Sequence, residues 1–283
     1  RDYRAPFPMV QAPAFDPTTA AGALAAARAG GFLLRDGAVH DLGIITNDDG
    51  FRVQAAMCSL MSAPLGPPNG WKIGATNEGG QKRFGITEPF RGPLFASYLF
   101  ATPCAVSAAG SGNILCAEAE VLFTMKAALP PRATCYSEAE VWAAVGTVHA
   151  AIEFVGQRCE GEGLLAKGCG FLLADGAANA GVVAGPGVPA ERLNPASIAA
   201  ATATLSYDGK VAGSEKCAFV YGSPVASLAW LANSLRARPV GGAGLRAGDV
   251  VSSGAVVALP VKAPCRVVAA IKGLGSAECD LSV

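Results

Sequence analysis

The chain has 283 residues, of which 51% are hydrophobic and only 16% are charged. This length and composition can bury a sizeable core as one large domain or two small ones, which argues against intrinsic disorder. The 22 lysines and arginines balance the 22 acidic residues. That balance argues against a nucleic-acid-binding protein, because such proteins carry a basic surplus.

The nine cysteines are irregularly spaced and include no Cys-x-x-Cys pair, which argues against a zinc or thioredoxin-like site. Most lie among apolar residues, so we expect reduced core residues in a reducing compartment. No signal peptide is visible, and the long uncharged stretches 92–117 and 218–235 are broken by proline, glycine or asparagine. The sequence therefore predicts a cytoplasmic protein without a membrane span.

The first quarter of the chain predicts an arm followed by helices. The stretch 1–17 is rich in proline and has little periodicity. An alanine-rich run over 18–28 predicts a helix that begins with a capping threonine and ends at a glycine pair. A second helix is expected to begin at Asn47 or Asp48 and to stop at a group of prolines. Residues 1–69 are therefore expected to form an N-terminal arm and helical region.

From residue 70 the pattern changes to short strands, so residues 70–283 are expected to form a β-rich domain. Two helices are predicted inside it. One covers 224–235, and the other begins at Ser137, because Ser137 and Glu140 have capping-box spacing and Val145 and Val148 continue a helical stripe. The expected strands are 71–74, 94–100, 117–125, 201–207, 218–221, 250–252, 256–259 and 265–271.

Two carboxylates that lie two residues apart, Glu118 and Glu120, enter one of these strands. Successive side chains of a strand point to opposite faces, so both carboxylates share one face. They repel each other unless a positive charge lies between them, and oxygen ligands suit a hard divalent cation. The pair alone leaves open a second interpretation, in which both glutamates are solvated on a surface strand.

Two further charged residues lie in apolar company. Lys72 stands between Trp71 and Ile73, so it is either an acid/base group with a lowered pKa or a lysine whose amine reaches water. Glu153 is a third carboxylate, and the cation of the glutamate pair is its candidate partner. Apolar neighbours that alternate with Glu153 favour a strand, whereas a helix would make His149 and Glu153 a metal pair of their own.

A series of short motifs follows in a characteristic order along the chain. They are Gly70-Trp71-Lys72-Ile73-Gly74, Phe84-Gly85-Ile86 with Glu88-Pro89, Ala117-Glu118-Ala119-Glu120, Ala151-Ile152-Glu153 with Arg158, Asp175 with Asn179, and the segments 228–233, 247–251 and 273–275. Through these motifs the chain, from about residue 45 to 283, resembles the fumarylacetoacetate hydrolase superfamily. The resemblance is greatest to its 2-keto-4-pentenoate hydratase and oxalocrotonate decarboxylase branch.

The resemblance implies an α+β fold, a mixed β-sandwich or roll around a metal, with an N-terminal helical region. It implies that residues 70–283 are the metal-binding catalytic domain. In this domain Glu118, Glu120 and Glu153 are expected to hold Mg²⁺ or Mn²⁺, and Lys72 is expected to be the acid/base group. The implied enzyme is a lyase of aromatic compound catabolism whose substrate, a small 2-oxo acid or its 2-hydroxy-dienoate enol, chelates the metal. Members of the family are homodimers or rings of dimers.

The chain departs from the family pattern at two places that lie near the substrate in relatives. Hydratases often carry an aspartate after the matching proline, whereas this chain has Phe90 followed by Arg91. The family's Asp-Asn-Ala-Ser segment reads Asp-Gly-Ala-Ala from Asp175, and Asn179 is expected to supply an amide instead. Arg91, Asp175 and Asn179 are therefore candidate substrate-binding residues. An inward-turned Arg91 would bind the distal carboxylate of a 2-oxo dicarboxylate.

Three alternatives to hydration stay open. The same metal-held enolate serves decarboxylation as well as C–C hydrolysis of acylpyruvates. Hydrolases of that kind use a histidine with a nearby acid, for which His40 with Asp41 is the only candidate in the first part of the chain. A non-catalytic metal-binding homologue is the remaining alternative, because Phe90 and Ala178 replace polar residues of the family pattern.

Overall fold

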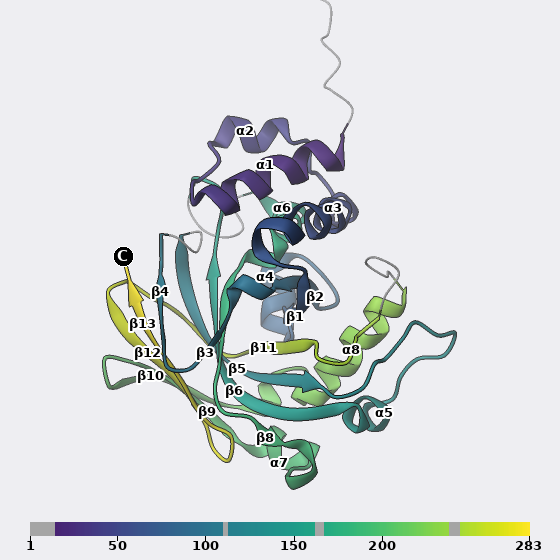
Figure 1. Cartoon of the computed structure of the whole chain (residues 1–283), viewed down its shortest axis with the longest axis vertical. Helices are drawn as coiled ribbons and strands as arrows, with labels where there is room; N and C mark the ends of the chain where they lie inside the picture. Colours follow the sequence, from purple (N-terminus) through teal and green to yellow (C-terminus); the bar gives the residue numbers. More distant parts are fainter. Residues whose placement is uncertain (1–14, 110–112, 162–166, 238–243) are drawn as a thin grey trace, which may run out of the picture.

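A layer of helices lies at one end of the molecule, above two β-sheets (Figure 1). The computed structural model describes residues 15–109, 113–161, 167–237 and 244–283, so most of the expected proline-rich arm lies outside the described residues. The helices are α1 (Pro17–Gly30), α2 (Asp36–Asp41), α3 (Asn47–Leu65), α4 (Glu78–Phe84), α5 (Glu138–Ala143), α6 (Gly168–Ala174), α7 (Pro195–Ala200) and α8 (Pro224–Ala237). Among the described helices, none is long and apolar enough to cross a bilayer.

The larger sheet has eight strands, and the smaller has five. The larger runs in the order β2 (Phe90–Phe95), β1 (Pro68–Gly74), β11 (Val250–Pro260), β5 (Ile114–Met125), β6 (Val145–Gly156), β7 (Asn179–Ala184) and β3 (Leu99–Ala101), with β8 (Val188–Pro189) paired to β6. The smaller runs β10 (Lys210–Lys216), β9 (Thr202–Tyr207), β12 (Cys265–Ile271), β13 (Gly275–Ser282) and β4 (Cys104–Ser107). Helices and mixed sheets together confirm the expected α+β class.

The main apolar core lies on one face of β5 and β6. Ala119, Val121 and Phe123 of β5 are buried in it together with residues of the small sheet. Side chains alternate along a strand, so the residues between them turn to the other face. There Leu122 packs in one cluster with Leu94 of β2 and Val182 of β7, from opposite ends of the sheet. The large sheet therefore curls, and the even-numbered face of β5 lies inside the curl.

The helix caps differ from the expected ones by one or two residues. Helix α1 begins after Asp16, whose side chain accepts hydrogen bonds from two backbone N–H groups of the first turn. Helix α3 is capped by Thr46, which forms a capping box with Asp49. The expected caps at a threonine of α1 and at Asn47 or Asp48 of α3 are therefore wrong. In both helices a suitable oxygen lies just upstream, at the spacing the motif needs.

Three expectations of secondary structure are corrected. The capping box at Ser137 is confirmed, but α5 is short, and Val145 and Val148 lie on β6. These two valines adopt a strand because β-branched side chains favour a pleated surface. Residues 217–219 form the 3₁₀ helix η4, which overlaps the first half of the predicted strand 218–221. Helix α4 was not predicted, although the sequence has a suitable N-cap residue, Asn77, directly before it.

Buried charges tie α1 to the strands. Arg28 of α1 is 3% exposed and donates to the carbonyl oxygens of Asp175 and Asn179 at 3.1 and 3.0 Å. Arg158 is fully buried, donates to the same two carbonyl oxygens, and bonds the Asp175 carboxylate at 2.7 Å. Burial and the neighbouring Arg158 lower the pKa of Arg28 to about 10. One carboxylate thus compensates two buried guanidinium groups.

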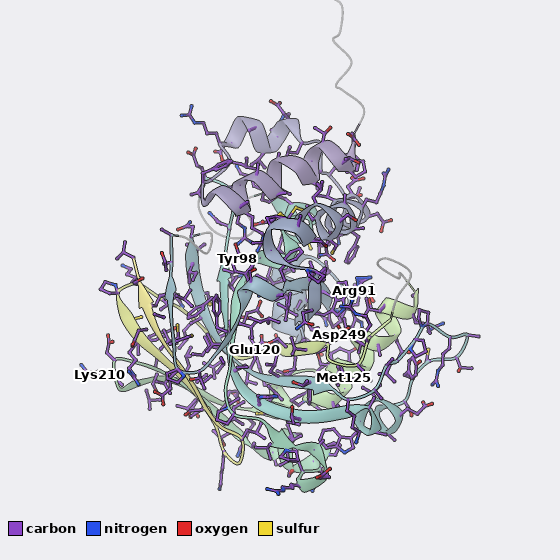
Figure 2. The ribbon with its side chains drawn as sticks, viewed as in Figure 1. Arg91, Tyr98, Glu120, Met125, Lys210 and Asp249 are labelled. Carbon is purple, nitrogen blue, oxygen red and sulfur yellow. The ribbon has the colours of Figure 1, made fainter. Side chains whose placement is uncertain are left out.

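The helical layer is also packed against residues far along the chain. Apolar side chains of α1 and α3 share one cluster with Phe171 of α6 and with Tyr98, which lies where the helices meet the sheets in Figure 2. Strand β1 begins at Pro68. The division of the chain at residue 69 therefore stays a prediction. Residues on both sides of this boundary pack in the same apolar cluster.

Asp175→Asn is expected to lower the free energy of unfolding by about 3–5 kcal/mol, because it leaves two buried guanidinium groups without a counter-charge. Urea denaturation measures the loss. Asp280→Asn is the matched control, since Asp280 is 68% exposed and lies 3.6 Å from Arg266. It should cost at most about 1 kcal/mol. Equal losses in both variants would contradict a structural role for the buried cluster.

Candidate metal centre

Three carboxylates meet inside the curl of the large sheet. Glu118 of β5 and Glu153 of β6 are direct partners in an antiparallel pair, and Glu120 follows two residues later on the same face. Ligand oxygens of the three residues all lie within 4.8 Å of one another. Glu120 and Glu153 are fully buried, Glu118 is half-buried, and Figure 2 shows Glu120 near the middle of the molecule. The expected strand at Glu153 and the shared face of the glutamate pair are confirmed.

Lys72 of β1 brings a positive charge to this cluster. Its Nζ lies 3.3 Å from Glu153 Oε1, and its side chain is 4% exposed. Burial lowers the pKa of Lys72, but the three carboxylates oppose this, and the net shift is upward. The lowered pKa considered for Lys72 from its apolar neighbours is therefore wrong for the metal-free cluster, where Lys72 is an ammonium group.

The carboxylates themselves are hard to ionise together. Burial and the charge of Glu153 raise the pKa of Glu118 to about 7, although Lys72 opposes the rise. Burial, Glu153 and Glu118 raise the pKa of Glu120 well above its usual range. The cause in both cases is the removal of charged groups from water with too little compensating positive charge. The cluster therefore favours binding of a further cation.

One oxygen of Glu120 is held by strand β11. Ser252 Oγ and the Gly254 backbone N–H both donate to Glu120 Oε2, the latter at 3.0 Å. The register of β11 against β5 shifts between Ser252 and Ala255, as in a β-bulge. Gly254 has a φ of 107°, and a Cβ there would lie 2.5 Å from the Thr76 hydroxyl oxygen. Only glycine fits this bend, which directs the N–H at the carboxylate.

One oxygen of Glu153 is held in the same way. Asn179 Nδ2 of β7 donates to Glu153 Oε1 at 2.9 Å, beside the Lys72 ammonium. The second oxygens, Glu120 Oε1 and Glu153 Oε2, are buried and have no hydrogen-bond partner in the part of the chain that the structure describes. Buried anionic oxygens without partners are costly, and a divalent cation between them would satisfy both. The residues present therefore fit a metal.

A cavity of about 630 Å³ opens beside the cluster. Lys72 and Glu118 line its inner part, so a molecule inside it reaches both groups. Most of the remaining wall is apolar and comes from α4, β2, β6, α6, η2 (Gly176–Ala178), η4 and β11. The apolar lining includes Phe84, Phe90, Leu115, Val155, Leu172, Ala177, Ala178, Phe219, Val256 and Pro260.

The other candidate substrate residues lie behind the cavity wall. Asn179 contacts Glu153, and Asp175 is held by two arginines, so neither lines the cavity. Arg91 is 1% exposed, its guanidinium lies over the rings of Trp71 and Phe51, and its Nε donates to Ser234. Arg91 therefore neither lines the cavity nor faces solvent, because alternation along β2 points Phe90 into the cavity.

Neither of the two histidines lines the cavity or belongs to the carboxylate cluster. His149 Nδ1 donates to the Gly185 carbonyl oxygen at 2.8 Å, and its Nε2 faces the hydroxyls of Thr124 and Thr147. Because β6 is a strand, no His149–Glu153 metal pair forms. His40 and its neighbour Asp41 are exposed on α2 and do not line the cavity. The support for a histidine-assisted hydrolase is thereby removed.

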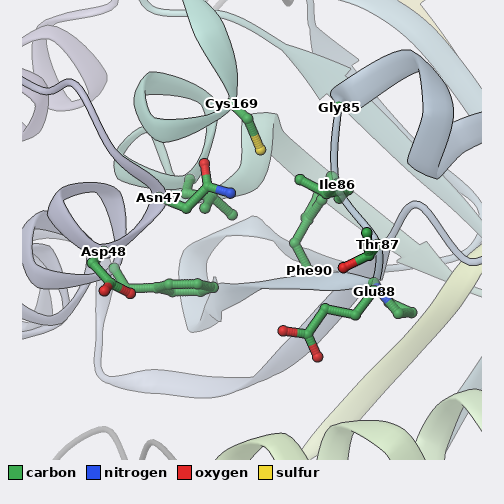
Figure 3. A pocket seen from close by; sticks show the side chains of 11 residues that line it. Asn47, Asp48, Gly85, Ile86, Thr87, Glu88, Phe90 and Cys169 are labelled. Carbon is green, nitrogen blue, oxygen red and sulfur yellow. The ribbon is translucent and has the colours of Figure 1, made fainter.

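A second cavity of about 290 Å³ lies between α3, α6 and the segment before β2. Figure 3 shows Asn47, Asp48 and Cys169 on one side of it, with Ile86, Thr87 and Glu88 facing them. Phe90 lines both cavities, so its ring separates them.

Sequence reasoning missed Ser252 and Gly254. The signal that could have found them is a glycine between two apolar strand segments, which is typical of a bulge. The sequence predicted two strands, 250–252 and 256–259, where the structure has the single bent strand β11.

Sequence comparisons identify relatives of this chain. No family model matches the chain. A 2-hydroxyhexa-2,4-dienoate hydratase of Comamonas testosteroni is 30% identical over 242 residues, which covers 84% of this chain and 87% of the relative. A 2-keto-4-pentenoate hydratase of Burkholderia vietnamiensis is 32% identical over 218 residues, with 75% and 78% covered.

Solved structures share the fold. The 4-oxalocrotonate decarboxylase from Pseudomonas putida G7, complexed with magnesium and adipate, has a TM-score of 0.82 at 22% identity and covers 94% of this chain and 97% of its own. The fumarylpyruvate hydrolase from Pseudomonas aeruginosa, in complex with Mn²⁺ and pyruvate, has a TM-score of 0.55 at 14% identity, with 75% and 88% covered. The chain is an enzyme of the fumarylacetoacetate hydrolase superfamily and belongs to its 2-keto-4-pentenoate hydratase branch.

Proposed function

We propose that this enzyme hydrates a small 2-hydroxy-dienoate, the enol of a 2-oxo acid, with Lys72 as its acid/base group. The observation that carries the proposal is the Lys72 ammonium 3.3 Å from Glu153, in the wall of a cavity that also reaches Glu118. The names of the curated relatives, both dienoate or pentenoate hydratases, support the substrate class.

Glu118, Glu120 and Glu153 would hold the cation, for which we propose Mg²⁺ or Mn²⁺ because hard oxygen ligands suit both. When bound, such a cation supplies Lewis-acid stabilisation of the negative charge on a 2-oxo oxygen. Ser252, Gly254 and Asn179 would fix the carboxylate orientations, since each holds one oxygen and leaves the other free.

Lys72 would transfer the proton that changes the double bonds. Lys72 lines the cavity, so as an ammonium group it can donate a proton to the terminal carbon of the dienol while the 2-hydroxyl loses its proton. The product of that step is a conjugated 2-oxo-3-enoate, and water then adds across its carbon–carbon double bond. Phe84 and Phe90 in the wall would keep bulk water from the carbon chain.

Decarboxylation is the second candidate reaction, and Phe90 is the observation that favours it. Where hydratases often carry an aspartate, an apolar ring lines the cavity and offers an attacking water no partner. Product mass separates the two reactions, because hydration adds one water and decarboxylation removes CO₂.

We also propose a cytoplasmic homodimer or ring of dimers. The support for the compartment is that all nine cysteines are free thiols. The support for assembly is the set of large apolar side chains left exposed on the single chain, such as Ile45, Val211 and Phe219. Sedimentation of the purified enzyme tests the oligomeric state.

Removal of divalent ions by a chelator should abolish turnover of 2-hydroxypenta-2,4-dienoate, and added Mg²⁺ or Mn²⁺ should restore it. Loss of enol absorbance measures the rate. Glu120→Gln should prevent this restoration, because the amide removes one of the three charges that hold the cation. Glu138→Gln, an exposed glutamate of α5, is the control. Full activity in the presence of the chelator would refute the metal-dependent mechanism.

Lys72→Met should lower kcat by about 10²-fold or more, the usual contribution of an acid/base group. Mn²⁺ affinity, measured by electron paramagnetic resonance, should stay nearly unchanged because Lys72 is not a ligand. Lys210→Met is the matched control, since Lys210 lies at the edge of the molecule in Figure 2. An unchanged kcat in Lys72→Met would remove this lysine from the mechanism.

Asn179→Ala should weaken Mn²⁺ binding by about tenfold, because Glu153 loses the donor that orients it. The measurement is again the Mn²⁺ resonance titration, with thermal unfolding to show that the variant is folded. Asn194→Ala, which removes the exposed cap of α7, is the control. Equal affinities in the two variants would show that Asn179 does not position the ligand.

A further inference from the structure

Helix α4 turns one face toward the cavity beside the metal cluster. Gly79, Gly80, Arg83 and Phe84 of this helix line the cavity, as expected for residues three and four apart. Lys82 does not line it and points elsewhere. The helix therefore contributes one cation and one aromatic ring to the cavity wall.

Arg83 is the charged lining residue that stands apart from the cluster. The charged residues of the wall are Lys72, Glu118 and Arg83, and the first two belong to the metal centre. Arg83 is exposed, and within the described chain its guanidinium makes no hydrogen bond, ion pair or ring contact. Its planar fork is therefore free to bind a carboxylate in a bidentate manner.

Apolar groups line the cavity together with the metal centre and Arg83. Phe84, Phe90 and Val256 are among them. Phe219 lines the cavity too, and its ring is 48% exposed. This volume of about 630 Å³ is typical of small-molecule sites, which span roughly 300–1,000 Å³. A hydrocarbon chain with a charged group at each end matches such a wall.

We propose that Arg83 binds the distal carboxylate of the substrate, so that the enzyme prefers a 2-oxo dicarboxylate over a 2-oxo acid with an uncharged tail. This inference rests on the proposed function, which places the 2-oxo end at the glutamates. Arg83 takes the role that the sequence suggested for Arg91, whose side chain lies outside the cavity. Phe84 and Phe219 pack along the carbon chain between the two ends.

The test compares two ligands that differ only in the distal group, 2-oxoadipate and 2-oxohexanoate. Their binding to the wild type, Arg83→Gln and Lys82→Gln is measured by isothermal titration with Mg²⁺, and oxalate reports on the metal end alone. Wild type and Lys82→Gln should prefer 2-oxoadipate by about fivefold, as for a solvent-exposed ion pair. Arg83→Gln should lose that preference and keep its oxalate affinity.

Salt provides a second readout, because an exposed ion pair is screened. At roughly 1 M salt, where the screening length is about 3 Å, the wild-type preference should shrink toward that of Arg83→Gln. Equal binding of both acids by the wild type, or an unchanged preference in Arg83→Gln, overturns the distal subsite and leaves the proposed function standing. Failure of the wild type to bind either acid or oxalate with Mg²⁺ overturns the metal chelate and the subsite together.

Discussion

Repulsion among three carboxylates on one buried face of β5 and β6 governs the structure around them. Unit charges interact far more strongly in a protein interior than in water, so carboxylates as close together as Glu118, Glu120 and Glu153 repel one another unless positive charge lies nearby. Such a grouping would be selected against in a purely structural core, because apolar residues of similar volume pack there at no electrostatic cost. The arrangement fits a site for a divalent cation.

Three separate strands provide the positive charge and hydrogen-bond donors that the carboxylates need. Lys72 comes from β1, the hydroxyl and amide donors at 252 and 254 from β11, and Asn179 from β7. In Glu120 and Glu153 these donors engage one carboxylate oxygen, and the second oxygen has no hydrogen-bond partner among the described residues. Behind Asn179, Arg28 and Arg158 bind its carbonyl oxygen, so the helical layer reaches the cluster through a chain of hydrogen bonds. Of these donors, Ser252, Gly254 and Asn179 do not line the cavity, whereas Lys72 does.

Features that depend on the alternation of side chains along a strand could be predicted from the sequence. Side-chain directions that depend on tertiary contacts could not. The shared face of Glu118 and Glu120 follows from strand periodicity alone, and so does the strand at Glu153. The direction of Arg91 does not, because the phase of β2 is set by its pairing with β1, which turns Phe90 inward. The sequence also contains signals for the Thr46 cap of α3 and for the bulge at Gly254. They were missed because Asn47 and Asp48 are good capping residues too, and because the glycine was taken as a break between two strands. The sequence around Lys72 left its role open, and the proposed acid/base role came from the family resemblance.

The parallel pairing of β1 with β11 sets the order in which this centre can assemble. Lys72 aligns with Ser252, a partner 180 positions further along the chain, and β11 lies between β1 and β5. Contacts of such high sequence separation form slowly, because the entropy cost of closing a large loop comes before the stabilising contacts form. Until β11 inserts, Glu120 lacks its hydroxyl and amide donors, and β5 has an open edge. During synthesis the nascent chain therefore carries an acidic, incomplete site, and catalytic competence arrives only with the last quarter of the polypeptide.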